Sequence, residues 1–385
     1  MFEQARYCKK FGNCERGKRI SGVTLFPFKT NAEGVCGRST TMFNRDVVLS
    51  NVGETLEDCM VYRHNKSLAY DQGFDEFLSR SRIFVNNGKT YRVHENVNMY
   101  LDVTGKCNGT CKFCIARTTY SRYSIHPAEY IQKFIKAYNG LGELNPSVQI
   151  VGGEPTLWSG LTDLLQAVDM LECRFPVIGT NGTGLKDRRI LSRLNSSSVK
   201  WVNLSRHHYN NKENFEIMGD GVPDNSALFS IVGDLRIPVR LQCNMIGGYV
   251  DTYGEIMQMI AYAYQKLNIK TIAFALLTPL PINTIYKSSI IKFVELHPAN
   301  CNKILEAVGK NRKFVFEKYR GGVACYYEIW KYIGYDEPMT VIFKYSDNNY
   351  LLKADMIDNC IPDIVMHTNG DVCGSWDRSI KKLSF

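Results

Sequence analysis

Three cysteines lie close together on a short glycine-containing loop, where their thiols can bind a metal centre. Cys107, Cys111 and Cys114 have the spacing C-x3-C-x2-C, and Gly105 and Gly109 give this loop the backbone freedom to fold around a ligand. Three thiolates so placed can hold three irons of a cubane and leave the fourth iron open. The spacing also fits a zinc site that takes a further ligand from elsewhere, or ordinary buried thiols, so it leaves these alternatives open.

The composition is that of a soluble globular protein with room for two or three domains. The chain has 385 residues, of which 44% are hydrophobic and 22% charged. Its first 18 residues contain no signal-peptide core and no apolar run reaches membrane-spanning length, so we expect a cytoplasmic protein with no membrane partner. In that compartment its 13 cysteines are more often metal ligands or reduced thiols than disulfides. The net charge of +9 permits anionic partners, but without a long basic run nucleic acid is the lesser alternative.

Strand-like and helix-like segments alternate between about residues 97 and 279. Predicted strands cover residues 99–103, 148–151, 177–179, 199–205, 239–246 and 270–277. Predicted helices cover residues 126–138, 161–171, 185–194, 212–235 with a break at 219–223, and 253–267. This order predicts a parallel sheet with right-handed crossovers. Because each polar motif follows a strand, we expect the motifs to meet at one ligand-binding edge, which favours the iron–sulfur interpretation of the cysteines.

Four motifs in this order resemble those of the radical S-adenosylmethionine (SAM) superfamily. They are the cysteine triplet after the first strand, Gly152-Gly153-Glu154-Pro155 after the second, Thr180-Asn181-Gly182 after the third and Ser205 after the fourth. The resemblance covers roughly residues 95–280. It implies a partial (β/α)6 barrel, a [4Fe–4S] cluster on the cysteines, SAM as cofactor or cosubstrate, and an electron donor such as flavodoxin or ferredoxin.

The resemblance also implies a reaction. The iron without a cysteine is chelated by the amino and carboxylate groups of SAM, and one electron from the reduced cluster breaks the C5′–S bond. Methionine and a 5′-deoxyadenosyl radical result, and the radical abstracts a hydrogen atom from an unactivated C–H bond. The protein orients the reactants and excludes water and oxygen.

Residues of the second and third motifs are candidates for binding SAM. The two glycines let the backbone approach the amino end of SAM, and Glu154 can accept a hydrogen bond from its ammonium group. A plain glycine turn with a surface glutamate is the alternative. Thr180 and Asn181 offer a hydroxyl and an amide to the ribose or adenine, although as a bare tripeptide this motif is only a turn signal.

Further polar residues near strand ends extend this set. Ser205 can bond to the ribose or the carboxylate of SAM, Arg206 or Arg240 to that carboxylate, and Asn244 to the ribose. Phe113, directly before the third cysteine, is expected to shield the cluster from water.

Two histidines and a C-terminal cysteine are candidates for contact with the substrate. His207 and His208 follow a strand, and one of them can face the barrel interior to bind substrate or shuttle a proton. Cys373 follows a turn, and its weak S–H bond can supply a hydrogen atom to a substrate carbon radical, as a cysteine does in some radical SAM epimerases. Filling a small apolar site is the ordinary alternative for Cys373.

The chain is expected to divide into three parts. Residues 1–92 form a small α+β accessory region, residues 93–284 the partial barrel, and residues 285–385 a helical and antiparallel-strand extension or lid. In this extension Cys360 and Cys373 faintly resemble the auxiliary-cluster (SPASM/twitch) type, which implies an auxiliary iron–sulfur cluster with a further ligand such as His367. A lid without metal is the preferred interpretation.

These features predict a radical SAM enzyme that acts on a small-molecule or peptide-like substrate in natural-product or cofactor biosynthesis. One alternative is modification of a nucleotide or a tRNA base, which the basic charge favours. Another is a non-catalytic iron–sulfur binding or sensing protein on a degenerate barrel. Intact Glu154 and Asn181 argue against a sensor, which has no need of a SAM site.

Overall fold

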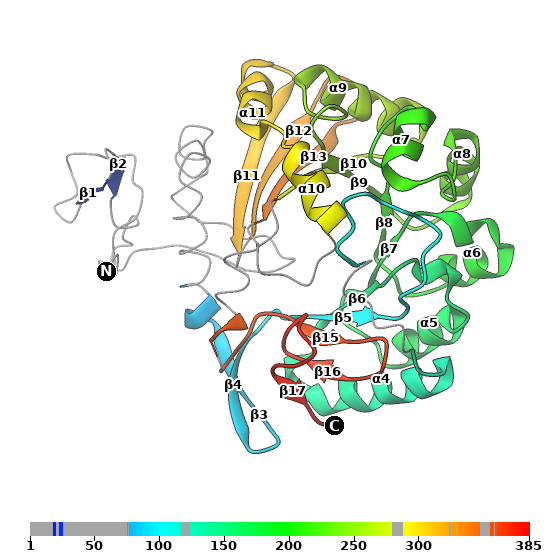
Figure 1. The fold of residues 1–385 in the computed structure, drawn as a ribbon, viewed down its shortest axis with the longest axis vertical. Helices are drawn as coiled ribbons and strands as arrows, with labels where there is room; N and C mark the ends of the chain where they lie inside the picture. Colours follow the sequence, from blue (N-terminus) through cyan, green and yellow to red (C-terminus); the bar gives the residue numbers. More distant parts are fainter. Residues whose placement is uncertain are drawn as a thin grey trace.

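The fold was obtained as a computed structural model, shown in Figure 1. It describes residues 18–20, 23–25, 75, 77–116, 124–278, 288–322, 325–346, 355–357 and 359–385. No helix in this described part is both long and apolar enough to cross a membrane.

Six parallel strands in chain order form the centre of the main sheet. They are β5 (Asn98–Asp102), β6 (Ser147–Val151), β7 (Val177–Thr180), β8 (Trp201–Ser205), β9 (Val239–Met245) and β10 (Thr271–Leu276). The helices between them are α4 (Pro127–Leu141), α5 (Leu161–Met170), α6 (Arg188–Asn195), α7 (Asn211–Met218), α8 (Asn225–Asp234) and α9 (Tyr253–Ala261). Each strand pairs in parallel with the next, and Figure 1 shows the helices on the outer side of the curved sheet. The predicted partial barrel is confirmed, and the sheet does not close on itself in the described residues.

Capping side chains begin most of these helices. Asp187, Asn210, Asp224 and Thr252 each accept a hydrogen bond from a backbone N–H in the first turn of α6, α7, α8 and α9, respectively. The helix α4 is capped by His126, whose Nδ1 accepts from the Ala128 N–H, and has Pro127 in its first turn, where a missing N–H costs nothing.

The C-terminal residues extend both edges of this sheet. After α10 (Ser288–Leu296) and α11 (Cys301–Lys310), β11 (Phe314–Gly322), β12 (Cys325–Tyr332) and β13 (Met339–Ser346) continue it beyond β10. At the other edge β15 (Ile364–Met366) pairs in parallel with β5, followed by β16 (Val372–Cys373) and β17 (Lys382–Leu383). The antiparallel strands expected here therefore belong to the barrel sheet instead of forming a sheet of their own.

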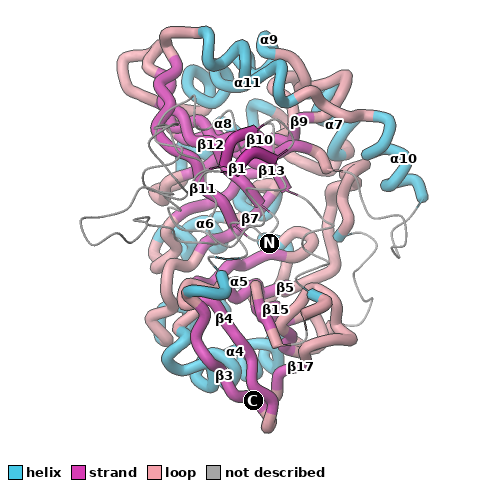
Figure 2. The backbone as a smooth tube through the Cα atoms, turned by 90° about the vertical axis from the view of Figure 1, so that its left-hand side faces the viewer, coloured by secondary structure: helices cyan, strands magenta, loops and turns pink. Residues whose placement is uncertain are grey.

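A separate small sheet joins residues from both ends of the described chain. The hairpin β3 (Ser81–Asn86) and β4 (Lys89–His94) turns at Asn87-Gly88, both with positive φ, as the Asn-Gly signal predicts. Parallel to β4 lies β14 (Cys360–Ile361), and Figure 2 shows the hairpin near β17. The strands β1 (Lys18–Ile20) and β2 (Val23–Leu25) pair with each other, and the rest of the expected accessory region before residue 75 lies outside the described residues.

Side chains on the parallel strands alternate between a buried outer face and a half-buried inner face. On β8, Val202 and Leu204 are fully buried in the hydrophobic core beneath the helices, whereas Trp201, Asn203 and Ser205 are half-buried. The same alternation runs through β9 and β13. Because strand side chains alternate between faces, the inner face of the curved sheet carries the half-buried, largely polar set.

We expect Phe134→Ala on α4 to lower the free energy of unfolding by about 3–5 kcal/mol, because its ring is completely buried between the helices and the sheet. The measurement is urea unfolding followed by tryptophan fluorescence. The control is Phe229→Ala on α8, whose ring is 64% exposed, with an expected change within about 0.5 kcal/mol. Equal losses in the two variants would contradict this assignment of the core.

Candidate functional site

The cysteine loop follows β5 and is held by backbone hydrogen bonds to the end of α7. The N–H of Thr110 donates to the carbonyl of Met218 at 2.6 Å, and the N–H of Lys112 donates to the carbonyl of Ile217 at 3.0 Å. These two hydrogen bonds fix the backbone of the loop through contacts within the chain. Its conformation follows from neighbours that the sheet places beside it.

The donor set and exposure of this loop fit a cluster. Cys107 is exposed and Cys111 and Cys114 are half-buried, so the thiols are accessible from the mouth of the barrel. In the described residues, no three His, Cys, Asp or Glu side chains are grouped as a single ion would require. A cubane takes one cysteine on each of three irons, so its ligands stand farther apart than those of one zinc ion. The assignment of these three residues as cluster ligands stays a prediction.

Gly152 and Gly153 are required by the close approach of the cysteine loop. A Cβ on Gly153 would stand 2.2 Å from the carbonyl oxygen of Lys106, and one on Gly152 would stand 2.7 Å from that of Thr104. The N–H of Gly153 donates to the same Thr104 oxygen at 2.6 Å, and the N–H of Glu154 donates to that of Lys106 at 2.8 Å. The two glycines therefore allow the backbone of the cysteine loop to pack closely against them.

Glu154 joins the loops after β6 and β7. Its Oε1 accepts hydrogen bonds from the Thr156 N–H at 3.0 Å, the Thr156 hydroxyl at 2.5 Å and the Thr180 hydroxyl at 2.5 Å. Its Oε2 accepts from the Asn181 N–H at 2.6 Å. The side chain is 1% exposed, and burial raises its pKa above the ordinary value, an effect that these donors offset only in part. Oε2 retains capacity for a second donor, so the predicted bond to a SAM ammonium would add to a structural role that the sequence did not reveal.

Asn181 stands between the third motif and the cysteine loop. Its Nδ2 donates to Oδ1 of Asn108 at 3.0 Å and lies 4.0 Å from Sγ of Cys107. Its Oδ1 accepts from the Thr183 N–H at 3.0 Å. Thr180, by contrast, is buried and bonded to Glu154, which leaves Asn181 as the member of this motif beside the cysteines.

Arg206 and Arg240 are both bonded within the chain, and their role at the SAM carboxylate stays a prediction. Arg206 is 1% exposed and its guanidinium is bonded within the chain, for example to the carbonyls of His208 at 2.9 Å and Pro223 at 3.0 Å. Arg240 lies near the amino end of β9, whereas the cysteine loop lies at the carboxyl ends of the strands. Ser205 and Asn244, at the carboxyl ends of β8 and β9, are half-buried and remain candidates for the cofactor.

The two histidines have different surroundings, and His207 is the one that contacts the cysteine loop. Nδ1 of His207 accepts the Asn244 N–H at 3.0 Å, and the ring meets Phe113 of the cysteine loop edge-on at 4.8 Å. Burial lowers the pKa of His207 to about 3, so its ring is neutral at pH 7 with the proton on Nε2, suited to hydrogen-bond donation and not to proton shuttling. His208 instead accepts the Asn210 N–H and stacks on Tyr209.

The C-terminal cysteines are buried. Cys373 has no exposed surface, burial raises the pKa of its thiol to about 11, and Sγ lies 3.9 Å from the Arg378 carbonyl oxygen. Cys360 is 1% exposed on β14, a strand of the other sheet. His367 is also buried, and its Nε2 has no hydrogen-bond partner among the described residues. A hydrogen-atom donor role for Cys373 and an auxiliary cluster both stay predictions.

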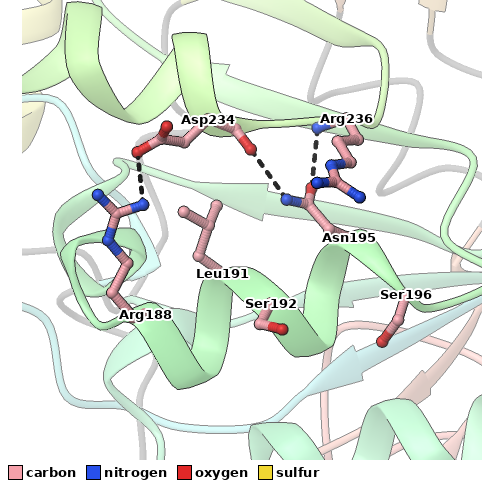
Figure 3. Close-up of a pocket in the computed structure, with 7 residues that line it drawn as sticks. All are labelled: Arg188, Leu191, Ser192, Asn195, Ser196, Asp234 and Arg236. Carbon is pink, nitrogen blue, oxygen red and sulfur yellow. Dashed lines mark hydrogen bonds and ion pairs between the residues drawn. The ribbon is translucent and has the colours of Figure 1, made fainter.

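A surface pocket between α6 and the end of α8 offers no site. Figure 3 shows several of its polar groups paired with one another: Arg188 bonds to Asp234 at 2.8 Å, and the Asn195 side chain bonds to the backbone of Asp234 and Arg236. It lies on the outer helical layer, away from the cysteine loop.

Sequence reasoning missed the polar inner face of the sheet. Asn203 and Gln242 lie there with Arg240, and Tyr327 and Lys344 continue the same face onto β12 and β13. The signal was present as a polar residue at every second position of β8 and β9.

Comparison with known proteins identifies the central part of the chain. Residues 101–263 match the family model described as the Radical SAM superfamily. The chain is 26% identical to a GTP 3′,8-cyclase of Aquifex aeolicus over 42% of this chain and 51% of that protein. It is 29% identical to an S-adenosylmethionine-dependent nucleotide dehydratase of Flammeovirga pacifica over 28% of this chain and 37% of that protein. The chain thus spans about half or less of these relatives.

A solved structure shares the fold. SuiB of Streptococcus suis, bound to S-adenosylmethionine, aligns with 83% of this chain and 70% of its own at a TM-score of 0.50 and 15% identity.

We expect Glu154→Gln to destabilise the fold as well as to weaken SAM binding. The amide replaces an acceptor with a donor beside Thr156, Thr180 and Asn181, at a cost of about 1–3 kcal/mol for the donors left unpaired. Urea unfolding and equilibrium dialysis with SAM on the same protein measure the two effects. The control is Glu143→Gln at an exposed position. Unchanged unfolding in Glu154→Gln would show that this carboxylate does not join the loops.

Proposed function

Because the chain belongs to the radical SAM superfamily, we propose that it is an enzyme that modifies a small-molecule or peptide-like substrate at the mouth of its partial barrel. Cys107, Cys111 and Cys114 would hold a [4Fe–4S] cluster there, and SAM would bind beside it. When bound, the cluster and SAM supply one-electron bond cleavage and hydrogen-atom abstraction.

One observation carries this proposal: the loops after three successive strands, β6, β7 and β8, meet the cysteine loop that follows β5. Glu154 after β6, Asn181 after β7 and His207 after β8 each contact that loop or the residues that hold it. A cofactor between these groups would face backbone, amide and imidazole donors that the fold holds in place before binding. Preorganisation of this kind lowers the free-energy cost of orienting the reactants.

The chain's own residues would bind and shield the reactants. Oε2 of Glu154 would accept from an ammonium group, and Nε2–H of His207 would donate to an oxygen. Phe113 packs on His207 and would shield the cluster from water. Cys107 is exposed, which leaves a route for an electron donor such as flavodoxin or ferredoxin.

A nucleotide or tRNA base is the second candidate substrate. The names of similar proteins, GTP 3′,8-cyclase and nucleotide dehydratase, support it, as does the presence of Arg240 and Lys344 on the inner face. A non-catalytic sensor is not retained, because the similar proteins are named as enzymes.

We expect anaerobic reconstitution of the chain to bind about four iron and four sulfide, since three thiolates can hold a cubane. Replacing Cys107, Cys111 and Cys114 together by Ala is expected to remove that iron and abolish formation of 5′-deoxyadenosine from SAM and dithionite. Iron, sulfide and nucleoside are measured on the same preparations.

The control is Cys243→Ala, whose thiol is buried in the core, and it should keep both the iron and the cleavage. Cleavage of SAM by the triple variant would contradict the proposed function. Residual iron without cleavage would point to a second cluster.

A further inference from the structure

A group of ionisable side chains lies inside the barrel, apart from the cysteine loop. It comprises Tyr100 on β5, Arg240 on β9, Tyr327 on β12, Lys344 on β13 and Asp363 just before β15; we call it the inner cluster. The sheet register puts Lys344 opposite Tyr327 and level with Ala275 and Asn244, and Arg240 lies on the same inner face, four residues before Asn244 on β9. Tyr327 links the two cations, because its ring lies 5.7 Å from the Lys344 ammonium, and burial raises its pKa, an effect that the nearby charge of Arg240 offsets in part.

The curvature of the sheet brings its distant strands together around this cluster. In sheet order β5 and β12 stand at opposite ends of the parallel strands. Even so, the pKa of Tyr100 is raised well above its ordinary value by burial and then by the neighbouring ionisable groups Asp363, Tyr327 and Cys325. The C-terminal strand β12 and the strand β5 therefore face the same barrel interior.

Arg240 is held in place yet has no counter-ion among the described residues. Its Nε–H donates to Oδ1 of Asn203 at 2.9 Å, and the guanidinium lies 5.7 Å from the ring centre of Trp201. Burial lowers the pKa of Arg240 from its ordinary value. A desolvated guanidinium without a carboxylate partner is costly, and its planar fork of donors matches an oxyanion.

Lys344 adds a second cation to the same interior. Its ammonium lies 5.7 Å from the ring centre of Tyr327, and no described carboxylate comes within ion-pair distance of it. Asp363 is the carboxyl group of the inner cluster, and burial raises its pKa to about 7. Near neutral pH, the two cations therefore outweigh the single, partly protonated carboxyl group.

We propose that Arg240 and Lys344 bind an oxyanion of the substrate, a phosphate or carboxylate, inside the barrel. Asn203 and Trp201 hold Arg240 in position, and Tyr327 lies against Lys344. The substrate would reach from this anchor toward the cysteine loop at the carboxyl ends of the strands. This inference rests on the proposed function for the reaction, but the anion site is a property of the chain.

Calorimetric titration of the reconstituted protein with inorganic pyrophosphate and, separately, with citrate tests the site. We expect binding of at least one of them, weakened about tenfold to a hundredfold in Arg240→Gln and in Lys344→Gln, as expected for the loss of a charge-assisted hydrogen bond. Pyrophosphate alone indicates a phosphate-bearing substrate, and citrate alone indicates a carboxylate.

The matched control is Arg188→Gln on the outer surface, which should bind as the original chain does. Binding of neither probe, or equal binding by all variants, overturns the inference. Formation of 5′-deoxyadenosine by the unaltered chain reports separately on the proposed function, so failure of one is not mistaken for failure of the other.

Discussion

The buried carboxylate of Glu154 is the interaction on which the arrangement of the mouth depends. A charge with 1% exposure is costly unless donors surround it, and here donors come from Thr156, Thr180 and Asn181. Its own N–H and that of Gly153 hold the cysteine loop. The side chain of Glu154 thus joins the loops after β6 and β7, and the backbone of the same turn holds the cysteine loop, which the end of α7 also holds.

The inner face of the sheet divides into two functional levels. At the carboxyl ends of the strands lie the cysteine loop, Asn181 and His207, and the latter two offer it an amide and a neutral imidazole. Arg240 lies deeper, near the amino end of β9, whereas Lys344, which a C-terminal strand supplies, lies level with Asn244. The reaction would then depend on the parallel strands, and recognition of the substrate in part on strands added at the edge of the sheet.

The sequence predicts the local features of this fold well and its long-range pairings poorly. Periodicity predicted all six parallel strands, and the break at 219–223 separates α7 from α8 as expected. The predicted helix 185–194 begins later, at Arg188, because Asp187 caps it. Periodicity carries no information on partners, so nothing predicted that β13 would lie beside β10 and β15 beside β5. In the same way, the sequence motifs singled out Glu154 and Arg206 as polar candidates but did not predict their hydrogen bonds within the chain.

The central claim is that SAM binds directly to a cluster held by the Cys107 loop. Electron paramagnetic resonance of the dithionite-reduced protein, recorded with and without SAM, tests it most directly. The account predicts the signal of a reduced [4Fe–4S] cluster whose g-values shift when SAM is added, because the iron without a cysteine gains new ligands. A cluster signal that saturating SAM leaves unchanged would contradict it.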